Sequence, residues 1–201
     1  MEKEIINYRG IDIEIAQDEY CESPDSWGNT DIFLVYDHRQ FYVERKGFDP
    51  QDIAEWYNAP LKSLDYESLD YDGYWVFPVA AYIHSGVSLS LTSKLGRQGW
   101  DTSVSGFILV SVKDWKDEIE AKKAAESLIE TWNEYLSGDV WGYNSEYGSC
   151  WGFYGDSGKE QMIEEAKSEI DYALKKLEQK RQEKLKVYIK NHVPLSNRIY
   201  A

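Results

Sequence analysis

The 201-residue sequence contains no run of apolar residues long enough to cross a membrane, and no basic N-terminal segment followed by an apolar core. A membrane-spanning helix needs about 20 such residues, and a secretion signal needs both segments. Two cysteines, Cys21 and Cys150, could pair, but a reducing compartment and a large core favour free thiols. These absences predict a cytoplasmic protein that does not contact a membrane.

Residue patterns that hold metals or cofactors are also missing. The three histidines, at positions 38, 84 and 192, lack paired spacing, and the chain has no Cys-x-x-Cys and no His-Glu-x-x-His. The acidic stretch 61–73 does not have the ligand spacing of a calcium loop. No glycine-rich phosphate loop follows a strand. The sequence therefore predicts no metal and no cofactor.

Apolar and aromatic residues are plentiful, at 42% and 15% of the chain. A chain of this composition and length can bury a sizeable core. We expect a single domain over residues 1–201, with residues 1–112 mainly in strands and residues 113–201 forming a helix, an aromatic hairpin and a long C-terminal helix.

Acidic charge is concentrated at the beginning of the chain. Residues 1–72 contain 18 Asp or Glu against 6 Lys or Arg, a net charge of −12 within a total of −14. Such a field repels nucleic-acid phosphate and favours a basic protein partner. The densest cluster comprises Asp65, Glu67, Asp70 and Asp72, which we expect in an exposed binding loop. An acidic surface that only keeps the protein soluble is the alternative.

Alternating apolar residues predict most of the strands. Residues 4–16 indicate a hairpin that turns at Arg9 and Gly10 and has one solvent-exposed face. Asp49 is expected to cap a short helix, since Asp is favoured at that position. Trp27, in a polar loop, is interpreted as a plug over the core, with an exposed binding contact as the alternative. Further strands are expected at residues 31–37, 41–44, 74–84, 87–91 and 104–112.

Two later segments change to a three- and four-residue apolar period, which predicts helices over residues 114–136 and 158–191. Strands adjoining in sequence and helices gathered late favour an α+β fold, a mostly antiparallel sheet with both long helices on one face. Trp132 and Ile170 should lie in the core. Beyond Leu177 the apolar residues become sparser, so the distal helix is expected to project from the core. It would then provide a surface for a homodimer or for another partner.

Between these helices, residues 136–156 form two short aromatic runs with many glycines. They predict a β-hairpin whose turn spans residues 144–149, with Gly148 able to take a positive φ angle. The run Ser149-Cys150-Trp151-Gly152-Phe153-Tyr154-Gly155 occurs together with His84-Ser85-Gly86 and with Trp100-Asp101.

This pattern resembles a family of small proteins of bacteriophages, plasmids and integrative elements of Gram-positive bacteria. Its other marks are the Ser23-Pro24-Asp25-Ser26-Trp27 turn and Ser105-Gly106-Phe107, and the likeness covers roughly residues 10–172. The resemblance implies a mobile-element protein in a bacterial host, without implying a particular chemistry.

Two functional hypotheses follow. The favoured one is an acidic binding protein that inhibits a host defence system, of the anti-CRISPR or anti-restriction type, by contacting a nuclease or other effector or by mimicking nucleic acid. Its binding residues would be the acidic cluster and Trp27. The alternative is a hydrolase or transferase that uses Cys150 as nucleophile with His84 and Asp101, since these residues supply the types that such catalysis needs.

Overall fold

The computed structural model describes residues 4–58, 70–92 and 102–194. Of these, about 42% are helical and 36% are in strands, which confirms the α+β class. The strands form two antiparallel sheets rather than the single sheet expected from the sequence. The chain divides into a terminal unit, residues 1–18 with 141–201, and a central unit, residues 19–140. Each is described by itself, and the single domain expected over residues 1–201 stays a prediction.

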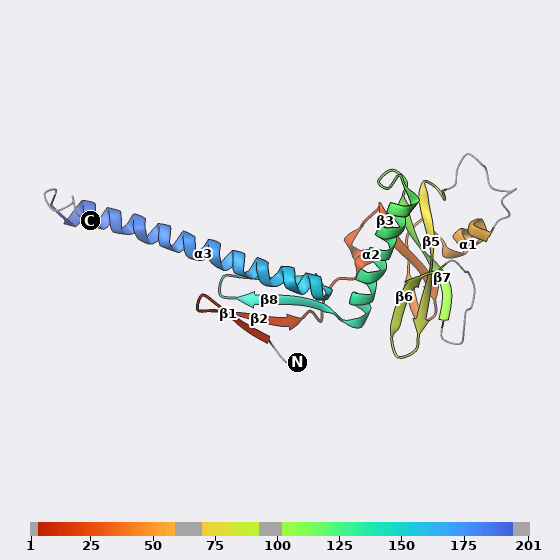
Figure 1. Cartoon of the computed structure of the whole chain (residues 1–201), viewed down its shortest axis with the longest axis horizontal. Helices are drawn as coiled ribbons and strands as arrows, with labels where there is room; N and C mark the ends of the chain where they lie inside the picture. Colours follow the sequence, from red (N-terminus) through yellow and green to blue (C-terminus); the bar gives the residue numbers. More distant parts are fainter. Residues whose placement is uncertain (1–3, 59–69, 93–101, 195–201) are drawn as a thin grey trace. The chain divides into compact units, whose positions relative to one another are not determined.

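The terminal unit contains a four-stranded sheet and one long helix (Figure 1). Arg9 and Gly10 turn the first hairpin with φ angles of 52° and 83°, which confirms the predicted position of the turn. On its other side, strand β2 does not pair with the next strand along the chain, which belongs to the central unit. It pairs instead with the first strand of the aromatic hairpin. In sheet order the strands are β1 (Glu4–Tyr8), β2 (Ile11–Gln17), β8 (Val140–Ser145) and β9 (Gly148–Tyr154).

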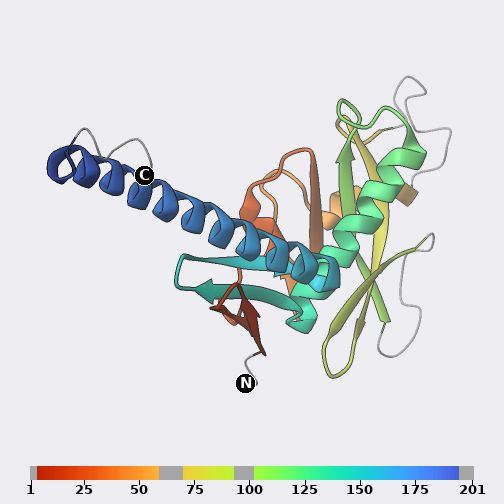
Figure 2. The same ribbon diagram turned by 60° about the vertical axis from the view of Figure 1, so that its left-hand side comes forward.

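Helix α3 (Gly155–His192) packs on this sheet with its N-terminal half. Ile170 is fully buried there, as predicted, although it lies in a different core from Trp132. The C-terminal part of the helix extends past the strands of its own unit (Figure 2), and Leu177, Leu185 and Val187 are more than half exposed. The terminal core consists of Ile13, Ile15, Tyr143, Met162, Ala166 and Ile170.

The central unit contains a five-stranded sheet in the order β4, β3, β7, β5, β6. Strand β7 is central, and β5 pairs antiparallel with β7 on one side and with β6 on the other. The β5–β7 register shifts between Val79 and Ala80, next to Pro78, which cannot donate a ladder hydrogen bond. The strands are β3 (Ile32–His38), β4 (Phe41–Val43), β5 (Tyr74–Ile83), β6 (Val87–Leu91) and β7 (Thr102–Ser111).

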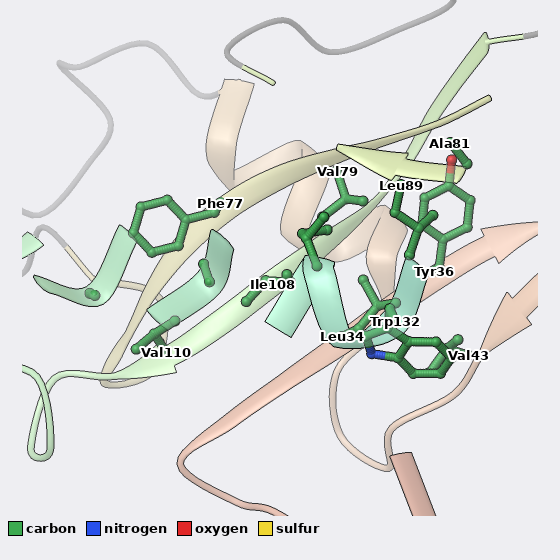
Figure 3. Packing of buried hydrophobic residues seen from close by; sticks show 13 residues of the cluster. Leu34, Tyr36, Val43, Phe77, Val79, Ala81, Leu89, Ile108, Val110 and Trp132 are labelled. Carbon is green, nitrogen blue, oxygen red and sulfur yellow. The ribbon is translucent and has the colours of Figure 1, made fainter. Parts of the chain in front are cut away.

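A helix covers each face of this sheet. On one face, α2 (Glu118–Ser137) buries Trp132 beside Leu34 and Val43 (Figure 3). On the other, α1 (Pro50–Asn58) buries Ile53 against Phe33, Val35, Phe107 and Leu109. A 3₁₀ turn, η1 (Pro24–Trp27), precedes β3.

Several local details depart from the expectations. Helix α2 begins at Glu118 instead of residue 114, because the Asp117 carboxylate caps it by accepting a hydrogen bond from the Ile119 N–H at 2.7 Å. The aromatic hairpin turns at Glu146 and Tyr147, and Gly148 does not have a positive φ angle. A Cβ at Gly148 would lie 2.2 Å from Glu169 Oε2, so a larger residue there would have to displace the end of the Glu169 side chain.

Candidate functional site: an acidic face on the central unit

The clearest concentration of charge lies beside helix α1. Asp49 caps this helix, since the backbone N–H of Gln51 donates to its carboxylate at 2.7 Å. The cap is brought there by a tight turn in which Gly47 has a φ angle of 90° and Arg45 bridges to Phe48. One helical turn along α1, Asp52 adds a second carboxylate. Both residues are thus fixed by the fold of residues 44–58.

Two further segments bring carboxylates to the same region. On the β3–β4 hairpin, Asp37 lies directly opposite Tyr42, and Glu44 follows β4. Tyr42 is 60% exposed, and its pKa is raised first by the negative charge of Glu44, then by partial burial and by the charges of Asp37 and Asp49. Carboxylates from separate segments therefore surround this tyrosine.

A second tyrosine, Tyr71, links the turn before β5 to the same helix. Its ring lies 5.3 Å from that of Trp56 in α1, in an edge-to-face arrangement, and its backbone bridges to Tyr74. Burial raises the pKa of Tyr71 first, followed by the charges of Asp52, Asp72 and Asp49. We define the acidic face as Asp37, Glu44, Asp49, Asp52, Asp70 and Asp72, arranged around Tyr42 and Tyr71.

The sequence-predicted binding residues belong only partly to this face. Asp70 lies in the turn before β5, where its Oδ1 accepts a hydrogen bond from the Gly73 N–H at 2.7 Å. Asp72 follows with a φ angle of 52°. Asp65 and Glu67 lie outside the described residues. Four residues of the face were not predicted as site residues, although the net charge of residues 1–72 was a signal for them: Asp37, Glu44, Asp49 and Asp52.

Trp27 is not a plug over the core. It ends η1 and is 43% exposed, whereas the neighbouring Pro24 is buried. A proline fits the start of such a turn, and Pro24, not Trp27, is the buried residue of this one. The exposed ring is consistent with the alternative interpretation, a binding contact.

The alternative catalytic set is not assembled within either unit. Cys150 is a half-buried free thiol on β9, packed with the terminal core. His84 belongs to the central unit, where it is exposed after β5 and stacked on Tyr82. Asp101 lies outside the described residues. The enzyme hypothesis stays a prediction without a supporting geometry.

A part-buried hydrogen bond connects the hairpin to α3. The hydroxyl of Tyr143 donates to Glu169 Oε2 at 2.8 Å. Burial, this hydrogen bond and the charges of Glu169, Glu165 and Cys150 raise the pKa of Tyr143 well above its ordinary value. The phenol therefore stays protonated and holds the helix to the hairpin, a structural role.

Within the ranges that the structure describes, no group of three or more His, Cys, Asp or Glu side chains is arranged to hold a metal ion. No helix in these ranges is long and apolar enough to span a membrane. No family model, curated protein sequence or solved structure matches the chain.

Proposed function

We propose that the chain is a binding protein whose acidic face engages a basic surface on a partner protein. The observation that carries this proposal is the convergence of carboxylates from three segments of the central unit around two tyrosines. A face of one charge sign raises the on-rate for an oppositely charged partner and disfavours nucleic acid itself.

The resemblance of the motifs to mobile-element proteins supports a specific setting for this binding. The partner would be a host nuclease or another defence effector, met in the bacterial cytoplasm, whose basic nucleic-acid groove is blocked by the face. Carboxylates at several positions can occupy sites that normally bind phosphates. The protein would then act as an inhibitor.

The test is a triple variant, Glu44→Gln, Asp52→Asn and Asp72→Asn, which removes three charges from the face. Its fold should persist, because these residues are exposed and Asn tolerates the positive φ angle at position 72. Immobilised wild-type protein should retain host proteins from a lysate. Adding duplex DNA or salt should release these proteins. The variant should retain them at least roughly tenfold more weakly, a loss of about 1.4 kcal/mol.

A matched control removes three exposed charges elsewhere on the central unit, by Asp114→Asn, Glu118→Gln and Glu120→Gln. This control should bind as wild type does. Retention by the face variant of the same proteins at the same salt would contradict the proposal. If both variants bound the host proteins equally weakly, the loss of binding would be due to net charge and not to the acidic face.

A further inference from the structure

An open groove of about 570 Å³ lies between helix α2 and strand β6 of the central unit. Val87 of β6 and Ile129 of α2 supply its apolar part, while Glu126, Glu130 and Glu134 line it with carboxylates. This groove is separate from the acidic face, whose residues belong to other elements. The inference from it is therefore independent of the proposed function.

The three glutamates follow one another at every fourth position of α2. Successive members of such a row are about 6 Å apart along a helix. Glu126 and Glu130 are exposed, and in the described part of the chain neither forms an ion pair. The groove thus presents a row of carboxylates beside an apolar strip.

The two walls of the groove are fastened to each other. The side-chain amide of Asn133 on α2 accepts a hydrogen bond from the Leu89 N–H at 2.7 Å and donates one to the Leu89 carbonyl at 3.0 Å. Leu89 is on β6, one of the two edge strands of the sheet. The spacing of the walls is therefore fixed before any partner binds, which lowers the cost of binding.

A surface of complementary character is found on the distal part of α3, residues 175–192. This segment contains seven Lys or Arg against two Glu, a net charge of +5 with histidine neutral. Lys176, Lys180 and Lys184 repeat at every fourth position, the spacing of the glutamate row. Beside them Leu177 and Tyr188 are more than half exposed.

We propose that distal α3 of a second copy of this chain docks in the groove between α2 and β6. The lysine row of one copy faces the glutamate row of the other, at equal spacing. Leu177 and Tyr188 cover the apolar strip formed by Val87 and Ile129. Charge pairs set the register and the buried apolar surface adds affinity.

The test uses two charge-reversed forms of the whole chain in sedimentation velocity across the micromolar range. The groove variant is Glu126→Lys with Glu130→Lys, and the helix variant is Lys180→Glu with Lys184→Glu. All four residues are exposed, so each variant should fold. Wild type should self-associate, and each variant alone should do so at least roughly tenfold more weakly.

Mixing the two variants distinguishes specific docking from loss of folding. In the mixture, the groove with lysines meets the helix with glutamates, and the remaining groove and helix keep their natural charges. Association should therefore return to near the wild-type level, and weaken as salt rises. Lys175→Glu with Lys186→Glu, on the opposite side of α3, should leave association unchanged.

A wild-type protein that stays monomeric over this range would overturn the inference. So would a mixture that associates no better than either variant alone, or an opposite-side control that weakens association as much as the helix variant. In the last case, the positive charge of α3 would promote self-association without a specific contribution from the lysine row.

Discussion

Asn133 is the residue at which a single substitution best tests the architecture of the central unit. Its amide satisfies both the N–H and the carbonyl of Leu89 on the edge strand β6, in the way that a neighbouring strand would. An edge strand without such cover presents unpaired backbone groups. Asn133→Leu removes both hydrogen bonds while keeping the number and branching of the side-chain heavy atoms, and it places no charge beside Glu130 and Glu134.

The expected cost follows from the two contacts. A hydrogen bond contributes roughly 0.5–1.5 kcal/mol net, and a buried group left unsatisfied costs about 1–3 kcal/mol. Leu89 is 3% exposed, so water reaches its backbone poorly. We expect Asn133→Leu to lower the free energy of unfolding by about 2–3 kcal/mol.

Amide hydrogen exchange measured by NMR, alongside urea unfolding, gives the decisive readout. The Leu89 amide should exchange faster in Asn133→Leu by more than the loss of global stability explains, because the damage is local to β6. Thr131→Val is the matched control, since it removes a hydrogen bond within α2, to the Ser127 carbonyl at 3.1 Å. It should leave Leu89 protected. An unchanged Leu89 amide in Asn133→Leu would refute the reasoning.

Two further predictions concern packing and pH. A Cβ at Gly106 would lie 2.1 Å from the fully buried ring of Tyr36, so Gly106→Ala should lower the free energy of unfolding by about 1–3 kcal/mol. Gly86→Ala is the control, because a Cβ there meets open space and should leave the free energy of unfolding unchanged. Equal thermal melting temperatures of the two variants would contradict this prediction. The pKa of Tyr143 is raised in the folded state, so its stabilising effect is present below the ordinary value near 10 and is lost as pH rises through the raised value. Urea unfolding of wild type should therefore become easier above about pH 10, and Tyr143→Phe should reduce this dependence; identical pH profiles would argue against it.

The sequence predicts local structure well wherever a single residue controls it. The helix cap at Asp49 and the hairpin turn at Arg9 and Gly10 are both confirmed. Each depends on a conformational preference that neighbouring residues do not override. The burial of Trp132 and Ile170 follows equally from the helical period.

Pairing between distant strands could not be predicted in the same way. Strand β2 joins β8 across more than a hundred residues, and the apolar alternation of residues 11–15 suits either sheet equally. The site shows the same limit. Total charge identified the acidic part of the chain, but the grouping of Asp37 with Asp52 depends on the β3–β4 hairpin and on the turn at Gly47.

The aromatic hairpin that carries the family resemblance is explained by packing within the terminal unit. A Cβ at Gly142 would lie 2.1 Å from the Trp151 ring, and one at Gly148 would meet Glu169. Tyr143 fills the core and hydrogen-bonds the same carboxylate. These close contacts give the glycines and Tyr143 of the hairpin a packing role. The charged surfaces of the central unit and of distal α3 do not take part in this packing, so function is better sought there.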